Sequence, residues 1–359
     1  MAKIQKEIAE LKLSQIHSLA EHRDRLRAEP HLRWLFFEVT DKCNLQCKHC
    51  GSSCTMVGQS LTAEDVERTL RTIRGERPMI CLTGGEPLLH PDFFEIAKRV
   101  NDLGFDWGMT TNATLIDDDV AAHLREVGLA TVSVSLDGME TAHDALRGQS
   151  GAWRRALNGV KALQKAGLRP QVTTVVHQGN IGDLDALYAL LSERNIESWR
   201  IINVEPIGRA CESSELLLTP EQFSYVISYI RKKRFDRTCP MEVTFGCSHY
   251  LGVEEERMVR DHYFLCAAGI LVASVRSNGD ICACLDVEDR EELTQGNIKK
   301  DDFMTVWLER FQAFRRDRTA ESEKCAACSE RFLCGGDSTH TWDFDRKQPR
   351  FCYRDYLIE

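Results

Sequence analysis

Short segments rich in β-branched and aromatic residues alternate with amphipathic stretches up to about residue 236, and this alternation restricts the fold most. Helix start signals lie between the segments at Thr62, Asp92, Asp117 and Asp183. Alternating strands and helices imply right-handed crossovers and a parallel sheet. No G-x-G-x-x-G follows the first segment, which favours a partial (β/α)6 TIM-like barrel in the α/β class. The predicted strands are 34–40, 79–85, 105–112, 131–137, 171–177 and 199–206.

The alternation stops after residue 236, where short hairpin-like pieces follow. One of them turns at Asn278 and Gly279, a pair that favours a tight β-turn. A chain of 359 residues also exceeds what one ordinary core requires. We therefore expect an N-terminal helical extension over 1–31, the barrel over 32–236, and a smaller Cys-rich domain over 237–359.

Composition and charge exclude several classes of partner. The net charge is -9 and the Lys and Arg residues are scattered singly, which argues against nucleic acid and against a basic membrane-binding face. No apolar run approaches the roughly 20 residues of a membrane span, and the start of the chain lacks a signal-peptide core. Fifteen cysteines, several of them clustered, indicate metal ligands in a reducing compartment. These features predict a cytoplasmic protein.

The first cysteine group contains Cys43, Cys47 and Cys50 in a C-x3-C-x2-C spacing, after the first predicted strand. A closed metal site normally uses four ligands, whereas three thiolates on a four-iron cluster leave one iron open. The alternative is a zinc site completed by Cys54 or His49. Local packing is the default explanation for Cys54, and the role of Glu38 stays open.

Other polar residues end the following strands, where parallel barrels bind their ligands. Gly84 and Gly85 permit a close approach to the backbone, and Glu86 offers a carboxylate to a cation. A zinc ribbon has no use for such a loop. The remaining strand ends carry Asn112, Ser135 with Asp137, and His177.

These motifs resemble those of the radical S-adenosylmethionine (SAM) enzymes, and the resemblance covers residues 32–235. It implies that Cys43, Cys47 and Cys50 bind a [4Fe-4S] cluster, whose open iron is chelated by the amine and carboxylate of SAM. Reduction of the cluster then yields a 5'-deoxyadenosyl radical that abstracts a substrate hydrogen. The SAM-binding residues implied by the resemblance are Gly84, Gly85 and Glu86 for the ammonium, Ser135 and Asp137 for the ribose, Asn112 beside the cofactor, Arg147 for the carboxylate and His49 near the adenine.

Three of these residues have a simpler explanation. Arg147 lies in HDALRG, which is also typical of an exposed helix turn with a surface ion pair. Ser135 and Asp137 could serve only as caps at the end of a strand.

The C-terminal cysteines resemble a SPASM domain, which binds auxiliary iron-sulfur clusters. The resemblance implies one complete site at Cys325, Cys328, Cys334 and Cys352, for which tetrahedral zinc is the alternative. At the other site Cys266 and Cys284 match, but Ser338 stands where the family has its last cysteine. Either Cys282 or Cys247 could replace it. If 282 and 284 belong to one strand, their side chains share a face, which favours Cys282.

The resemblance implies an oxidoreductase that most often modifies a ribosomally made peptide by crosslinking, thioether formation, epimerisation or oxidation. The alternatives are an enzyme acting on a small molecule, such as a sugar alcohol or a tetrapyrrole, and a non-catalytic electron carrier. An electron carrier needs closed clusters, so it would not require the cation-binding loop TGGEP at residues 83–87. Expected partners are flavodoxin or ferredoxin as reductant and a separate peptide-recognition protein, because the chain begins only about 30 residues before its first strand. The sequence identifies no catalytic acid or base.

Overall fold

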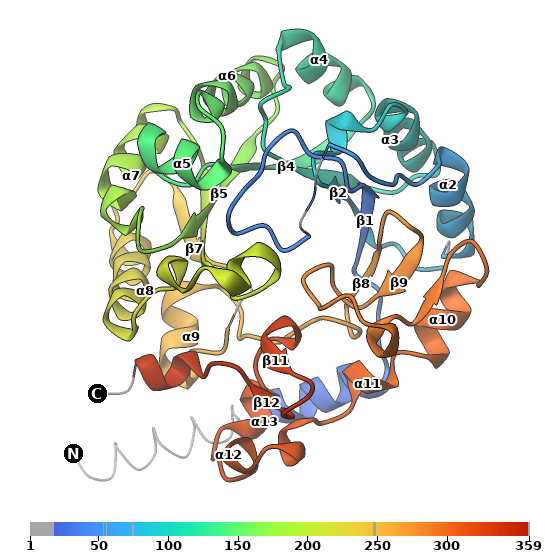
Figure 1. Cartoon of the computed structure of the whole chain (residues 1–359), viewed down its shortest axis with the longest axis vertical. Helices are drawn as coiled ribbons and strands as arrows, with labels where there is room; N and C mark the ends of the chain where they lie inside the picture. Colours follow the sequence, from blue (N-terminus) through green and yellow to red (C-terminus); the bar gives the residue numbers. More distant parts are fainter. Residues whose placement is uncertain (1–17, 53, 55, 74, 247–248, 358–359) are drawn as a thin grey trace.

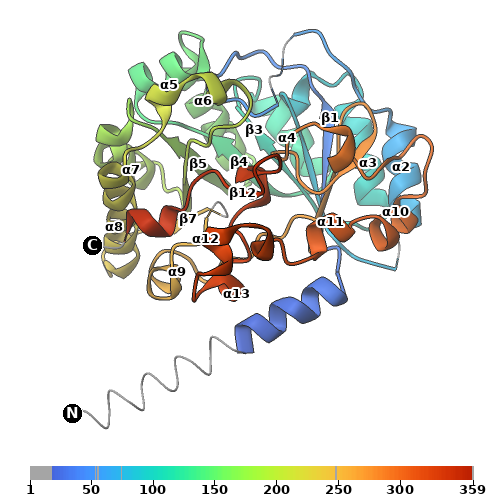
Figure 2. The same ribbon diagram turned by 60° about the horizontal axis from the view of Figure 1, so that its bottom comes forward.

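The computed structural model describes residues 18–52, 54, 56–73, 75–246 and 249–357. Most of the predicted N-terminal extension and Cys247 lie outside these residues. The described part of the extension is helical over 18–28. In Figure 2 this helix lies beside the C-terminal part of the chain, away from the sheet.

The strands form the partial barrel that the alternation predicts. Figure 1 looks along the barrel, with the helices arranged around its outside. In the described residues ten strands make one sheet in the order β10-β9-β8-β1-β2-β3-β4-β5-β6-β7, and every neighbouring pair from β8 to β7 is parallel. The predicted strands correspond to β1 (Trp34–Thr40), β2 (Met79–Gly84), β3 (Trp107–Thr111), β4 (Leu129–Ser135), β5 (Pro170–Val176) and β6 (Ser198–Asn203).

The helix start signals were predicted correctly, but two long helices were missed. Thr62 caps its helix through a reciprocal capping box with Asp65, and the Asp117 side chain accepts a hydrogen bond from the backbone of Val120. The missed helices are α6 and α8. The barrel helices are α2 (Ala63–Thr72), α3 (Phe93–Asp102), α4 (Asp118–Glu126), α5 (Glu140–Arg147), α6 (Ala152–Lys165), α7 (Leu184–Glu193) and α8 (Pro220–Phe235).

Residues after 236 extend the barrel sheet at both of its edges. The strand β7 (Glu242–Phe245) pairs with β6, and β8 (Val272–Val275) pairs with β1. Gly279 turns β8 into the antiparallel β9 (Asp280–Cys282) with a φ of +96°, as the Asn-Gly pair predicts. The boundary at 236/237 stays a prediction, because strands on both sides of it share one sheet.

The remaining C-terminal elements are short. They are α9 (Val253–Val259), β10 (Gly296–Asn297), α10 (Phe303–Glu309), α11 (Gln312–Arg315), α12 (Glu323–Ala326), α13 (Arg331–Cys334), β11 (Trp342–Asp343) and β12 (Gln348–Pro349). One continuous hydrophobic core includes Phe37 of β1, Trp199 of β6 and Trp307 of α10, so it runs from the barrel into the C-terminal part. Among the described helices, none has both the length and the apolar character that a bilayer crossing requires.

Candidate active site

The predicted polar residues gather at the carboxyl ends of the parallel strands. The three-cysteine loop follows β1, Glu86 follows β2 and Asn112 follows β3. Ser135 is the last residue of β4, and His177 follows β5. Because these strands are neighbours in one parallel sheet, the residues lie together at the carboxyl end of the barrel, as the sequence predicted.

The Gly-Gly-Glu loop packs directly on the three-cysteine loop. The backbone N–H of Gly85 donates to the Thr40 carbonyl over 2.8 Å, and that of Glu86 donates to the Lys42 carbonyl over 2.8 Å. A Cβ atom added to Gly84 would collide with the Thr40 carbonyl, and one added to Gly85 would collide with the Lys42 carbonyl. Glycine is therefore required here for contact between the two loops.

Glu86 is a fully buried carboxylate that bridges to the third strand. Its two oxygens accept hydrogen bonds from the Thr111 hydroxyl and the Asn112 backbone N–H, each over 2.8 Å. Burial raises the pKa of Glu86 to about 7, although these two donors favour the ionised form. A cation bound next to Glu86 would therefore stabilise its ionised form.

Asn112 links this strand end to the three-cysteine loop. Its side-chain amide donates to the side-chain oxygen of Asn44 over 2.9 Å, and Asn44 directly follows Cys43. Asn112 thus holds the first part of the loop in place beside Glu86.

Cys43, Cys47 and Cys50 lie together in a small apolar cluster with Leu45 and Ala152. Burial raises the pKa of Cys43 to about 11 and also raises that of Cys47, whereas an Arg147 guanidinium nitrogen 3.6 Å from the Cys47 sulfur favours its thiolate. These thiols in an apolar setting suit an iron-sulfur cluster, which thiolates bind and which water exclusion protects.

Cys54 lies beside this cluster and interacts directly with Cys50. It is buried and its thiol is hydrogen-bonded to Cys50. That hydrogen bond lowers the pKa of Cys50 to about 5 and raises the pKa of Cys54, so the shared proton stays on Cys54. Cys54 therefore supports the thiolate of Cys50.

Asp137 and Arg147 form a buried ion pair with a separation of 2.6 Å. Burial alone would raise the pKa of Asp137, but Arg147 brings it below its ordinary value. The second Asp137 oxygen accepts the backbone N–H of Val175 over 2.9 Å. The explanation of Arg147 as part of an exposed helix turn is wrong, because α5 packs this residue against the three-cysteine loop.

Two histidines at the same edge have open ring nitrogens. Burial lowers the pKa of His49 to about 4 and also lowers that of His177, so both rings are neutral near pH 7. Among the described residues, Nδ1 of His49 and Nε2 of His177 are buried without a hydrogen-bond partner. Both nitrogens can therefore receive a polar group of a ligand.

Arg209, in the loop after β6, was missed by sequence reasoning. Its backbone N–H donates to the Cys50 carbonyl over 3.0 Å, and its side chain donates to the carbonyls of Cys47 and Cys54 over 2.9 and 3.3 Å. Arg209 thus clamps the three-cysteine loop. No motif marks it, because its partners lie more than 150 residues earlier in the chain.

Members of the second cysteine group lie near one another in pairs. Arg354 donates to the Cys328 sulfur over 3.2 Å and also acts electrostatically on Cys352. Cys334 and Cys352 interact electrostatically, as do Cys325 and Cys328. Cys325 lies in α12, Cys328 in the turn that follows it, Cys334 in α13 and Cys352 before the C-terminal turn, and their assignment to one site stays a proposal.

Of the remaining cysteines, the structure places Cys266 beside Ser338. The Cys266 sulfur accepts the backbone N–H of Thr339 over 3.3 Å, which puts it next to the buried Ser338. The strand argument for Cys282 fails, because β9 ends at Cys282 and a bend at Ala283 separates it from Cys284. Cys282 is 1% exposed and interacts electrostatically with Arg276 and Glu38.

We expect Cys282→Ala to retain the full iron content and cluster spectrum of the reconstituted protein, because Cys282 faces a different set of residues from Cys284. Iron analysis and electron paramagnetic resonance (EPR) of the anaerobic protein measure this. The matched variant is Cys284→Ala, which should lose about one cluster's iron. Equal iron loss in both variants would make Cys282 the replacement for the family cysteine at 338.

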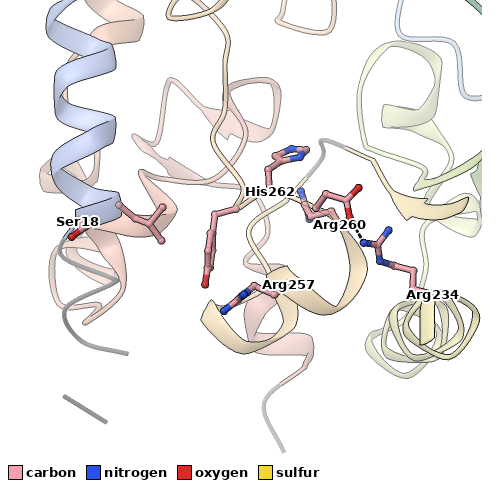
Figure 3. A pocket seen from close by; sticks show the side chains of 8 residues that line it. Ser18, Arg234, Arg257, Arg260 and His262 are labelled. Atoms are coloured by element: carbon pink, nitrogen blue, oxygen red, sulfur yellow. Dashed lines mark hydrogen bonds and ion pairs between the residues drawn. The ribbon is translucent and has the colours of Figure 1, made fainter. Parts of the chain in front are cut away.

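A separate cavity of about 580 Å³ lies away from these residues. Figure 3 shows its lining near the N-terminal helix and α9, with Arg234 paired to Asp261. None of its lining residues belongs to the predicted site.

Comparison with known proteins agrees with this geometry. Residues 37–191 match the radical SAM superfamily, and residues 266–329 match the SPASM iron-sulfur cluster-binding domain. The chain is 28% identical over 345 residues to the AdoMet-dependent heme synthase of Methanosarcina barkeri, covering 90% of this chain and 97% of the relative. It is 29% identical to the mycofactocin maturase MftC of Mycolicibacterium smegmatis, covering 84% and 76%. The crystal structure of Streptococcus suis SuiB bound to precursor peptide SuiA has a TM-score of 0.76 at 19% identity, covering 90% and 76%.

A partial parallel barrel whose first loop carries three clustered thiols beside a buried carboxylate defines the class of SAM-dependent iron-sulfur proteins. The chain carries a radical SAM domain over residues 37–191 and a SPASM iron-sulfur cluster-binding domain over residues 266–329. Its cofactors are SAM and [4Fe-4S] clusters.

Proposed function

We propose that Cys43, Cys47 and Cys50 hold the [4Fe-4S] cluster that binds SAM. The observation that carries this proposal is the direct packing of the loop of Glu86 on the loop of these three thiols. When bound and reduced, such a cluster would supply the electron for reductive cleavage of SAM, and the resulting 5'-deoxyadenosyl radical would abstract a hydrogen atom from the substrate. The protein itself binds, orients and shields the reactants.

Each SAM-binding role follows from a charge or an open polar group at this edge. The Glu86 carboxylate suits the methionine ammonium, and the Arg147 guanidinium suits the methionine carboxylate. Ser135 ends β4 and Asp137 lies two residues beyond it, where we place the ribose, and neutral His49 is available to the adenine. Leu45 and Ala152 keep water from the thiols. Gly84, Gly85 and Asn112 fix the two loops against each other.

We expect Glu86→Gln to weaken SAM binding at least about tenfold, because a charge-assisted hydrogen bond contributes on the order of 1.5 to 3 kcal/mol. Isothermal titration of the anaerobic protein with SAM measures the affinity, and iron analysis should show unchanged cluster content. The matched control is Glu256→Gln, another fully buried carboxylate that accepts two backbone N–H groups. Equal affinity in Glu86→Gln and the parent protein would make Glu86 a structural cap.

For the substrate, we propose a tetrapyrrole with carboxylate side chains. Its support is the similarity to a heme synthase over nearly that relative's whole length. Arg209 agrees with this class, because one of its terminal nitrogens is buried without a partner among the described residues and can receive a carboxylate. This choice replaces the peptide that the sequence analysis favoured.

A ribosomally made peptide is the second candidate substrate. It is supported by the similarity to a mycofactocin maturase and by the shared fold with SuiB. On a peptide substrate, the enzyme would form a crosslink or a thioether, epimerise a residue or oxidise a side chain.

Transfer of deuterium from the substrate to 5'-deoxyadenosine distinguishes the two substrate classes. Anaerobic reactions receive dithionite, SAM and either a side-chain-deuterated iron porphyrin carrying propionates or a deuterated peptide encoded beside the gene. We expect deuterium in 5'-deoxyadenosine only with the porphyrin. Transfer only from the peptide would favour the second candidate, and transfer from neither would remove both. A flavodoxin or ferredoxin reductant and a cytoplasmic location remain part of the proposal.

A further inference from the structure

Asp337 connects a cysteine of the C-terminal group to the rest of the molecule. Its backbone N–H donates to the Cys334 sulfur over 3.2 Å. Asp337 has a φ of +64°, which is costly for a residue other than glycine, and it follows the left-handed Gly335 and Gly336. Such a conformation persists only where its surroundings hold it.

The polar groups of Asp337 show what holds it. One carboxylate oxygen accepts the backbone N–H groups of Tyr250 and Ser338 over 3.0 and 2.9 Å, and the Asp337 carbonyl accepts Arg318 over 2.6 Å. The other carboxylate oxygen faces Nδ1 of His249 over 3.3 Å. The direction of the Asp337 N–H toward Cys334 therefore depends on its carboxylate partners.

His249 is fully buried between two carboxylates. Its Nε2 contacts Glu205, and its ring stacks on Tyr353 with centroids 3.8 Å apart. Burial alone would lower the pKa of His249, but Glu205 and Asp337 raise it to about 9, so both ring nitrogens carry protons. The charged ring can then donate to both carboxylates at once.

Glu205 belongs to the barrel and lies two residues after β6. Its Oε1 also accepts the side-chain amide of Asn203, the last residue of β6, over 2.8 Å. A continuous hydrogen-bonded path thus runs from the carboxyl end of β6 through Glu205, His249 and Asp337 to Cys334.

We propose that Glu205, His249 and Asp337 are positioning residues that aim the Asp337 N–H at Cys334 and thereby raise the reduction potential of the second auxiliary cluster. Hydrogen bonds to cluster sulfurs set the potential, because they stabilise the more negative reduced state. The inference rests on the proposed role of Cys325, Cys328, Cys334 and Cys352 as that cluster's ligands. It gives the barrel a direct influence on the auxiliary cluster.

The test uses the full-length protein with Cys43, Cys47 and Cys50 replaced by alanine, so that only C-terminal clusters are observed. An EPR-monitored redox titration gives each midpoint potential, and Cys328→Ser identifies the signal of the second auxiliary cluster by its loss. If no signal or iron depends on Cys328, the proposed cluster site itself fails. That outcome differs from a result in which the cluster is present but its potential does not depend on Glu205, His249 and Asp337.

We expect His249→Phe to shift the Cys328-dependent midpoint to a more negative value with unchanged iron content. Asp337→Asn retains the residue's shape and its tolerance of positive φ but loses the ion pair, so it should shift the midpoint in the same direction. The matched control is His90→Phe, which removes a buried histidine of the barrel whose Nε2 is 2.6 Å from the Leu61 carbonyl. It should leave the midpoint unchanged.

An unchanged midpoint potential in either variant that retains its iron would show that the three residues only connect parts of the structure and do not control the potential. If His249→Phe fails to fold, Asp337→Asn decides. Loss of iron in both variants would assign the residues to cluster assembly and overturn the proposed control of the potential.

Discussion

Replacing Cys43, Cys47 and Cys50 together by alanine is expected to abolish conversion of SAM to 5'-deoxyadenosine and methionine while the C-terminal iron stays in place. The three thiols share one apolar cluster, and none of the second cysteine group belongs to it. On the proposed assignment, replacing the three thiols removes all protein ligands of one cluster and none of the other.

The measurement is the yield of 5'-deoxyadenosine from the anaerobic protein with dithionite, together with iron per chain. A matched triple variant replaces Cys81, Cys211 and Cys239, which lie outside both groups, and should keep the parent yield. SAM cleavage that persists in the first triple variant would refute the assignment of these cysteines.

Arg147→Met is expected to lower the free energy of unfolding by about 3 to 5 kcal/mol, because it leaves Asp137 as an unpaired buried charge. Asp137 is fully buried and lies 2.6 Å from the Arg147 guanidinium. The same variant should bind SAM at least about tenfold more weakly, because it loses the charged donor that we propose for the methionine carboxylate.

The double variant Asp137→Asn with Arg147→Met separates these two effects. It removes both charges, so most of the lost stability should return, whereas the weak SAM binding should persist. Urea denaturation measures the free energy of unfolding, and titration with SAM measures the affinity. Full recovery of SAM affinity in the double variant would show that Arg147 only neutralises Asp137.

The strand and helix pattern predicted the barrel because its signals are local. Thr62 and Asp117 cap their helices through neighbours three residues away, and strands such as β1 (WLFFEVT) are rich in aromatic and β-branched residues. The two missed helices differ in their signals. The N-cap of α6 is Gly151, which makes no side-chain cap hydrogen bond, whereas α8 has a capping box at Thr219 that could have revealed it.

The predicted pairing of Cys282 with Cys284 shows where local rules failed. Alternation along a strand would have turned both side chains to one face, but the strand stops at Cys282 and the chain bends at Ala283. The place where a short strand ends depends on its neighbours in the sheet, here β8, and sequence spacing does not contain that information.

The sequence by itself determined the class of fold and the two kinds of domain, and it predicted the iron-binding thiols, because periodicity, caps and cysteine spacing are properties of nearby residues. The tertiary structure alone decided that β8 joins β1, that Arg209 clamps the three-cysteine loop, and that His249 links Glu205 to Asp337. These contacts join residues tens to hundreds of positions apart. Such pairs leave no period or motif in the chain, and only burial in a common core brings their charges and hydrogen-bonding groups together.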